Sequence, residues 1–472
     1  MKSFIMFLLL SVLFLGGCSE PLSVKNNFEE PEFKNVTVHD PSVIQSEGSF
    51  YIIGSHLGFA KTKDLIQWEQ LSTSVPNSKL FSNVYDELAE SFEYAKTKTL
   101  WAGDIIQLDD GKFYMYYTAA EGSTPLSTLG VAVSDHVEGP YEDLGIILKS
   151  GSIKEDGQMH DATVEPNVID PHVFYDKDNY LWMVYGSYSG GIYILKMDEA
   201  TGKPEPNQEY GKKLLGANHS RIEAPYILYS PETSYYYLFL SFGGLDANGG
   251  YNIRVARSKN PDGPYIDAKN QDMIEAKGAV GSFFDDKAIE PYGAKLMGNF
   301  ILDSNEIFST AGYISPGHNS AFYDPKLNKY FLFFHTRFPN RGEEHEVRVH
   351  QFFFNEKDWP VIAPLRYAGE TIQMYTENQV FGKYQFVNHG TDITNDIKET
   401  QSIELKKNGK ISGELTGSWK IKDGESASLI IDDIEYNGVF LSQWNDYENK
   451  STITFTGMSS SGVSVFGIRT IN

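Results

Sequence analysis

The chain has 472 residues, and 63 acidic side chains outnumber 40 basic ones, which gives a formal net charge of −23. This length exceeds one ordinary hydrophobic core and suits a large domain together with a smaller one. Hydrophobic residues make up 41% of the chain and aromatic residues 14%, which excludes a disordered protein and indicates one rich in β-strands. The acidic balance argues against nucleic acid or anionic lipid as a partner and is compatible with a neutral polymer such as a polysaccharide.

The first residues have the pattern of an export signal. A basic residue precedes an apolar run from Phe4 to Leu15, which is too short to span a bilayer as a mature helix. The run ends in Leu-Gly-Gly-Cys, which resembles a bacterial lipobox with Cys18 as the lipid-bearing residue. An ordinary signal peptide that ends near a cysteine is the alternative. We therefore expect a signal peptide over residues 1–17, a polar tether over residues 18–34, and a secreted protein or a lipoprotein on the outer cell surface.

Five segments of the chain share one pattern, in which a short apolar run and a turn precede an aromatic strand that ends in small polar residues. These aromatic strands begin near Phe50, Phe113, Tyr180, Tyr236 and Tyr330. The spacing leaves room for about two further strands in each unit. A unit of about four strands that recurs five times predicts an all-β fold with a five-bladed β-propeller, because one blade cannot bury both of its faces alone. A β-sandwich with coincidental aromatic strands is the alternative.

When the five units are aligned on their apolar pairs, one position lies three residues upstream in each of them. It is occupied by Asp40, Ala102, Asp170, Ala224 and His318. Because the innermost strand of every blade starts at the central channel, we expect these positions to converge there. Glu223 lies one residue before the fourth of them. Converging carboxylates raise one another's pKa and destabilise the fold, so a cluster of this kind indicates a functional site.

The same residues lie in motifs that resemble glycoside hydrolase family 43. The motifs are VHDPSVI, WAGDI, NVIDPHVFYD, YGSYSGGI, HSRIEAPYI and SPGHNSAFYD, and the resemblance covers roughly residues 35–367. Within that family the chain is more similar to the endo-1,5-α-L-arabinanases that carry a lipocalin-like C-terminal domain. The resemblance implies a five-bladed propeller, in agreement with the repeats, and an enzyme that hydrolyses α-1,5-linked arabinan.

The resemblance also implies a role for each residue of the cluster. Asp40 is expected to be the general base, Glu223 the general acid, and Asp170 the residue that orients the acid and keeps its pKa high. An inverting glycosidase needs one carboxylate to activate water and one carboxylic acid to protonate the leaving oxygen. His318 is expected to hold one calcium ion largely through water, because a single imidazole cannot hold a hard cation by itself. A histidine with a purely structural role is the alternative.

Substrate-binding residues follow from similarity alone. We expect the substrate groove to be lined by Gly103, Asn167, Asp170, Ser187 and Ser189, with Trp101 or Tyr188 stacked on a sugar ring. Turn chemistry and core packing are the alternatives for each of these residues. His345 and His350 could form a metal pair, but their alternation with valines favours a β-strand.

The pattern changes beyond about residue 367. Short alternating strands with glycine-containing turns predict a small antiparallel β-barrel or sandwich over residues 368–472, after a propeller domain over residues 35–367. This part resembles the lipocalin-like domain of longer arabinanases and gathers no catalytic residues. We expect it to support the propeller by packing or to extend the substrate groove.

Three functions fit these observations. The first is inverting endo-hydrolysis of linear arabinan, the second is an exo-acting arabinofuranosidase or β-xylosidase of the same fold, and the third is a glycan-binding surface lipoprotein without catalysis. The complete set of Asp40, Asp170 and Glu223 argues against the third, since a binding protein has no need for a proton donor. We expect arabinan and arabino-oligosaccharides as partners, calcium as cofactor, no nucleic acid, and a monomer.

Overall fold

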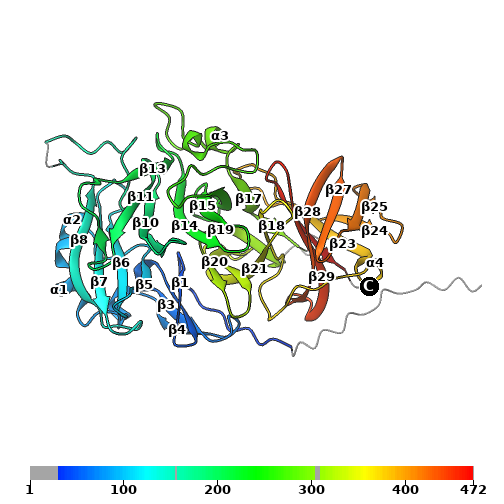
Figure 1. Ribbon diagram of the computed structural model, residues 1–472, viewed down its shortest axis with the longest axis horizontal. Coiled ribbons are helices and arrows are strands. Elements are labelled where there is room, and N and C mark those ends of the chain that lie inside the picture. The colour runs from blue at the N-terminus through cyan, green and yellow to red at the C-terminus, as the bar shows by residue number, and fades with distance from the viewer. Residues whose placement is uncertain (1–29, 155–156, 303–308, 471–472) are drawn as a thin grey trace, which may run out of the picture.

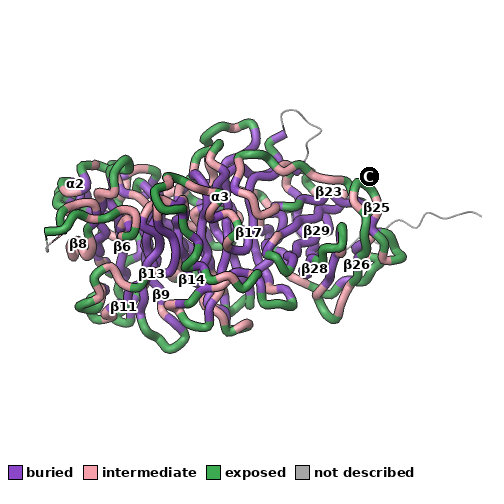
Figure 2. The backbone as a smooth tube through the Cα atoms, turned by 90° about the horizontal axis from the view of Figure 1, so that it is seen from above, coloured by how far each residue is buried: buried purple, intermediate pink, exposed green. Residues whose placement is uncertain are grey.

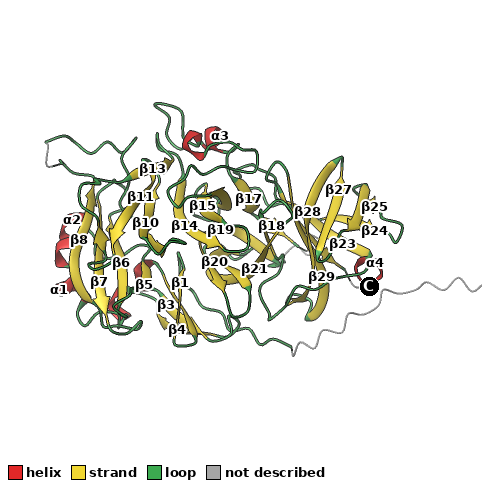
Figure 3. Ribbon diagram, viewed as in Figure 1, coloured by secondary structure: helices red, strands yellow, loops and turns green. Residues whose placement is uncertain are grey.

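The computed structural model describes residues 30–154, 157–302 and 309–470, which form five sheets and a closed barrel (Figures 1 and 3). The five sheets are the blades of a propeller, so the predicted all-β fold and the repeat count are confirmed. The expected signal peptide and most of the tether fall on residues 1–29, which lie outside the described residues. No helix within the described ranges is long and apolar enough to cross a membrane.

The first two blades each consist of four antiparallel strands in sequence order. Blade one contains β1 (Ser42–Ser46), β2 (Ser49–Ile53), β3 (Phe59–Thr62) and β4 (Trp68–Ser72). Blade two contains β5 (Asp104–Gln107), β6 (Phe113–Ala120), β7 (Ser127–Ser134) and β8 (Glu142–Ser150). Two short helices, α1 (Val84–Glu87) and α2 (Ala89–Ala95), connect these blades.

The remaining blades depart slightly from the four-strand pattern. Blade three contains β9 (His172–Tyr175), β10 (Leu181–Ser187), β11 (Gly191–Asp198), β12 (Lys203–Pro204) and β13 (Lys212–Leu215), and both β12 and β13 pair with β11. Blade four contains β14 (Ile222–Ser230), β15 (Tyr235–Phe242), β16 (Asn252–Ser258) and β17 (Ala294–Met297), with α3 (Asp286–Ile289) in its last loop. Blade five contains β18 (Phe300–Ile301), β19 (Gly312–Asp324), β20 (Lys329–Arg337), β21 (His345–Phe354) and β22 (Pro360–Ile362).

The innermost strands surround a central channel, as the repeat alignment predicts. A cavity of about 440 Å³ at one end of this channel is lined by the aligned apolar pairs Val43-Ile44, Ile105-Ile106, Val173-Phe174, Ile227-Leu228 and Ala321-Phe322. The equivalent positions therefore do face one axis. The predicted catalytic residues belong to the other end of the same strands.

Hydrophobic clusters between neighbouring blades hold the ring together, and the buried strands form the interior of the molecule (Figure 2). The ring is closed between blades one and five, where Val43 and Phe50 share a core with Phe331 and Phe333. Burial of one large apolar side chain contributes about 1.5–3 kcal/mol. The propeller is therefore stabilised by its blade interfaces rather than by its channel.

The C-terminal part forms a closed eight-stranded barrel rather than a sandwich (Figure 1). Its strands are β23 (Gly382–Asn388), β24 (Gln401–Leu405), β25 (Lys410–Gly413), β26 (Gly417–Ile421), β27 (Ser426–Ile431), β28 (Ile434–Asn445), β29 (Lys450–Ser459) and β30 (Ser464–Arg469). The short helix α4 (Glu377–Val380) precedes the first strand, and β23 pairs with β30 to close the barrel.

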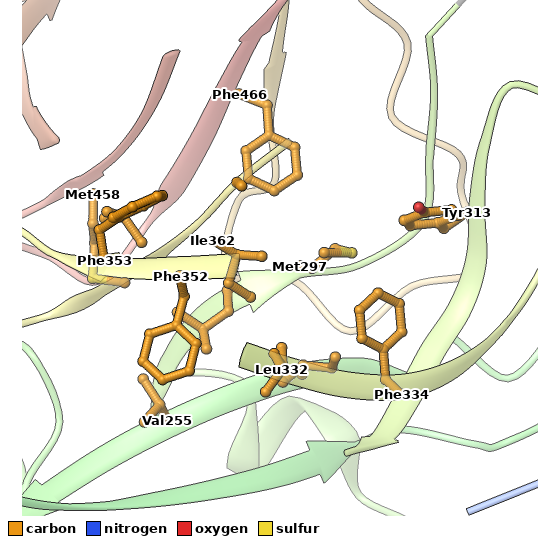
Figure 4. Packing of buried hydrophobic residues seen from close by; sticks show 14 of the residues in the cluster. Val255, Met297, Tyr313, Leu332, Phe334, Phe352, Phe353, Ile362, Met458 and Phe466 are labelled. Atoms are coloured by element: carbon orange, nitrogen blue, oxygen red, sulfur yellow. The ribbon is translucent and has the colours of Figure 1, made fainter. Parts of the chain in front are cut away.

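The barrel shares a core with blades four and five. Met458 and Phe466 of the barrel pack with Phe353 and Ile362 of blade five, and Val255 of blade four belongs to the same cluster (Figure 4). The two parts therefore share this hydrophobic cluster, and the interior of the barrel has a further core of its own.

A loop of the barrel also contacts blade four beside the channel. The fully buried guanidinium of Arg254 donates hydrogen bonds to the carbonyl oxygens of Tyr292 and Thr391, which joins blade four to the β23–β24 loop. Next to it, a Cβ on Gly250 would lie 2.8 Å from the backbone of Thr394. This close approach positions the barrel loop next to Tyr251, the residue that precedes β16.

Candidate active site

The four residues expected to form the site lie together at one mouth of the channel. They line a cavity of about 190 Å³ whose walls are His39, Asp40, Ser55, His56, Trp101, Asp170, Glu223, Leu245 and His318. The carboxylates of Asp40, Asp170 and Glu223 are all buried, with residue exposures of 8%, 5% and 7%. Three buried carboxylates in one cavity destabilise the fold unless nearby groups compensate their charge.

The backbone places these residues through one repeated feature. Asp40, Asp170, Ala224 and His318 all have positive φ values, between 44° and 61°. In blades one and three the residue lies just before the first strand, whereas in blades four and five it lies at an irregularity inside a longer strand. Positive φ is uncommon for residues other than glycine, and its recurrence at a shared position indicates that the turn aims these side chains into the channel.

Asp40 is surrounded by hydrogen-bond donors. The Nδ1 atoms of His39 and His318 lie 2.8 and 2.9 Å from its Oδ1, and the Ser55 hydroxyl donates to its Oδ2. Its backbone N–H donates to Nδ1 of the buried His335 at 3.2 Å. Burial alone would raise the pKa of Asp40, but the imidazoles of His318 and His39 outweigh it and hold that pKa well below its usual range. Asp40 is therefore ionised at neutral pH.

Glu223 and Asp170 have the opposite electrostatic character. Burial raises the pKa of Asp170, and the negative charges of Glu223 and Asp40 raise it further against the opposing effect of His318. Burial likewise raises the pKa of Glu223. The two groups therefore retain a proton to higher pH than an exposed carboxyl would. The cavity therefore combines one carboxyl group that ionises readily with two that hold a proton more strongly, which is the contrast that acid–base chemistry uses.

Two hydroxyl groups hold the carboxylate of Glu223. Ser187 donates to Oε2 and Tyr251 donates to Oε1, each at 2.8 Å. Burial raises the pKa of Tyr251 well above its usual range, so this phenol stays neutral and acts as a donor. A Cβ on Gly317 would lie 2.0 Å from the Tyr251 ring, so the ring packs against a position that admits only glycine.

A second cavity of about 370 Å³ continues from the first and shares Trp101, Glu223 and Leu245 with it. Four of the expected substrate-binding residues line the second cavity: Trp101, Asn167, Ser187 and Ser189. Tyr188, the alternative stacking residue, lines it as well. Asp170 lines the first cavity. Gly103 lines neither cavity; it is buried, and a Cβ there would lie 3.0 Å from the carbonyl oxygen of Tyr116.

Three residues that the sequence did not single out belong to the site. His39 precedes Asp40 in the first motif, and Ser55 lies just after the aromatic strand β2 of the same unit. Both are short-range neighbours of Asp40, so the motif itself carried the signal. Tyr251 carried no signal of this kind, because its aromatic ring is one among 29 tyrosines and its partner lies 28 residues away.

Within the part of the chain that the structure describes, one group of side chains beside the catalytic cavity could hold a metal ion. The described group that could hold an ion comprises His39, Asp40 and His335. His318 is not in that group, but its Nδ1 faces Asp40, which leaves its other ring nitrogen as the candidate ligand atom. His345 and His350 both lie in β21, as the strand interpretation predicts, and His350 bonds Tyr313 and the Ala363 carbonyl.

The comparison with protein families agrees with this geometry. A family model described as "Glycosyl hydrolases family 43" matches residues 33–360, and one described as "C-terminal lipocalin-like domain" matches residues 364–467. The chain belongs to glycosyl hydrolase family 43. It is therefore a glycoside hydrolase, and the second match corresponds to the barrel.

Several family 43 proteins resemble the chain over nearly its whole length. "Extracellular endo-alpha-(1->5)-L-arabinanase 2" of Bacillus subtilis (strain 168) is 55% identical over 464 residues, which cover 97% of this chain and 99% of the relative. The "Extracellular endo-alpha-(1->5)-L-arabinanase" of Thermotoga petrophila is 51% identical, over 93% of this chain and 95% of the relative.

Solved structures give the same result. The crystal structure of the endo-1,5-alpha-L-arabinanase from Thermotoga petrophila RKU-1 has a TM-score of 0.90 at 50% identity, and covers 93% of this chain and 100% of its own. The crystal structure of a family 43 glycoside hydrolase from Bacillus licheniformis has a TM-score of 0.91 at 56% identity. The match covers 94% of this chain and 100% of that protein's chain.

From the hydrogen bond between Tyr251 and Glu223 we predict that removal of the Tyr251 hydroxyl changes the pH dependence of kcat. Tyr251→Phe removes a donor to Glu223, which disfavours the carboxylate and raises its pKa further. We expect the alkaline limb of the pH–kcat profile to move to higher pH, because the acid stays protonated longer. The maximal rate should fall about tenfold or more, since a hydrogen bond to a charged group contributes about 1.5–3 kcal/mol.

Tyr265→Phe is the matched control, because the Tyr265 hydroxyl donates to the Pro261 carbonyl in the same blade. It should leave the profile unchanged. An unshifted alkaline limb in Tyr251→Phe would contradict the proposed influence of this hydroxyl on Glu223.

Proposed function

We propose that the protein catalyses the inverting endo-hydrolysis of α-1,5-linked arabinofuranosyl bonds in linear arabinan. The observation that carries the proposal is that the carboxyl groups of one cavity have opposite pKa shifts. The pKa of Asp40 is lowered, while the pKa values of Glu223 and Asp170 are raised. The relatives that match over nearly the whole chain are named endo-arabinanases. The second cavity supports endo action, because it gives a polymer room to continue beyond the acid.

The reaction that fits this geometry has one displacement step. Asp40 accepts a proton from a water molecule, which attacks the anomeric carbon, while Glu223 gives its proton to the leaving glycosidic oxygen. The C–O bond to the leaving sugar breaks as the bond to water forms, so the configuration inverts. The hydroxyls of Ser187 and Tyr251 then stabilise the carboxylate that Glu223 becomes. The charge of Glu223 raises the pKa of Asp170, so the two neighbouring carboxyl groups together retain a proton before the step.

The acid assignment is tested by Glu223→Gln. We expect the variant to keep its fold and lose at least a hundredfold in kcat on linear arabinan, because the leaving oxygen would receive no proton. Turnover can be followed by reducing-sugar release, with circular dichroism as the fold control. Glu47→Gln, at an exposed position, is the matched control and should retain full activity. Near wild-type turnover of Glu223→Gln would rule out this acid.

Calcium is the second part of the proposal. The cavity favours positive charge, as the pKa of His318 indicates. Burial alone would lower this pKa, but the charges of Asp40 and Asp170 outweigh burial and raise the pKa of His318 to about 9. A dication would supply such charge, and with Nδ1 of His318 donating to Asp40 the second ring nitrogen could bind it. Water would supply most other ligands, since one imidazole does not satisfy a hard cation. The ion, when bound, would offset the repulsion between the carboxylates and order water.

Removal of the ion tests this part. We expect prolonged chelation to lower activity on arabinan and calcium to restore it. His318→Ala should copurify with less calcium by elemental analysis, while the exposed His136→Ala should match the wild type. Equal calcium content in all three proteins, or full activity after chelation, would contradict the assignment of His318.

Export is the third part. The relatives that match over nearly the whole chain are named extracellular enzymes, which supports secretion of this chain. Residues 1–17 would then be the signal peptide, and the Leu-Gly-Gly-Cys sequence is the basis for proposing Cys18 as a lipid anchor. Cys18→Ala should move the protein from the membrane fraction to the medium, whereas Ser19→Ala should not. A wild-type protein found entirely in the medium, or a mature N-terminus well beyond residue 18, would favour an ordinary signal peptide.

A further inference from the structure

A loop of blade four presents two adjacent phenylalanines to solvent beside the site. Phe283 is 68% exposed and Phe284 is 39% exposed, and their rings lie 4.2 Å apart between centroids. Scattered exposed apolar residues are normal, but two adjacent exposed aromatic rings at a cavity indicate a surface that something covers.

The loop is held in place by specific contacts. Phe284 has a φ of +58°, a conformation that is rare for a bulky side chain. Its N–H donates to the His219 carbonyl at 3.1 Å, and Arg221 donates to Asp286 at 3.0 Å just beyond it. The Phe283 ring packs on the His219 ring at 4.9 Å. A strained residue that is fixed from both sides indicates a pre-organised surface.

Both phenylalanines line the second cavity, on the side of the acid. That cavity includes Glu223 but neither Asp40 nor Asp170, which line the first cavity. In an inverting displacement, water attacks from the side of the base and the leaving group departs on the opposite side, where the acid protonates it. The second cavity therefore lies on the side of the leaving group.

We propose that Phe283 and Phe284 form a stacking platform for an arabinose unit of the leaving portion of the chain. This inference rests on the proposed function and adds the direction in which the polymer is bound. The platform holds the part of the polymer on the reducing-end side of the cleaved bond. A furanose ring has a face of C–H groups that can pack on an aromatic ring. The exposed ring of Phe283 is available for such a contact. Trp101 and Tyr188 line the same cavity nearer to the catalytic residues.

The test compares substrates that differ only in the leaving portion. Phe283→Ala should lower kcat/KM on arabinohexaose about 3- to 10-fold, the range expected for one aromatic stacking contact. On arabinobiosyl fluoride, whose leaving group is too small to reach the loop, kcat/KM should stay unchanged. Phe283→Tyr should retain activity on both substrates, because it keeps the ring.

Tyr180→Ala is the matched control, since Tyr180 is 66% exposed in the turn before β10. It should match the wild type on both substrates. Unchanged activity of Phe283→Ala on arabinohexaose, or an equal loss on the fluoride, would overturn the platform. A wild-type enzyme that cleaves neither substrate would instead contradict the proposed function, so the two failures are distinguishable.

Discussion

The burial of three carboxylates in one cavity is the constraint on which the rest of the site depends. Two imidazoles and one hydroxyl contact Asp40, while Asp170 accepts a bond only from the Ala224 N–H, at 3.3 Å, among the described contacts. The unequal distribution of donors favours the ionised form of Asp40 over that of Asp170. The placement of His39 and His318 therefore supports Asp40 as the proposed base.

The propeller makes this concentration of charge tolerable. Its stability comes from the hydrophobic interfaces between blades, so the channel mouth can hold charged groups without being the source of stability. The barrel extends the core of blades four and five, and its β23–β24 loop packs behind the blade that supplies Glu223 and Tyr251. Arg254 ties the two parts together through backbone carbonyls. These contacts favour a supporting role for the barrel over a direct role in binding.

Much of this could be predicted from the sequence, because a propeller repeats one register. The shared position upstream of each apolar pair identified Asp40, Asp170 and His318, and Glu223 followed from its neighbour. The small polar residues at or just after the ends of the aromatic strands, such as Ser55 and Ser187, were visible as a pattern. Their hydrogen bonds to Asp40 and Glu223 depend on how the strands are arranged in space. Tyr251 could not be found, since it precedes β16 and reaches Glu223 of β14 only because both of these strands pair with β15. The extra strand β18 and the strained loop at Phe284 also depend on tertiary packing rather than on local pattern.

The central claim is that an ionised Asp40 activates water opposite the leaving group protonated by Glu223. The anomeric configuration of the first product tests it most directly. Proton NMR of arabinan oligosaccharides during early turnover should show the β-anomer at the new reducing end, formed from an α-linkage and then equilibrating with the α-anomer. Initial appearance of the α-anomer would mean a covalent intermediate and would contradict the single-displacement account.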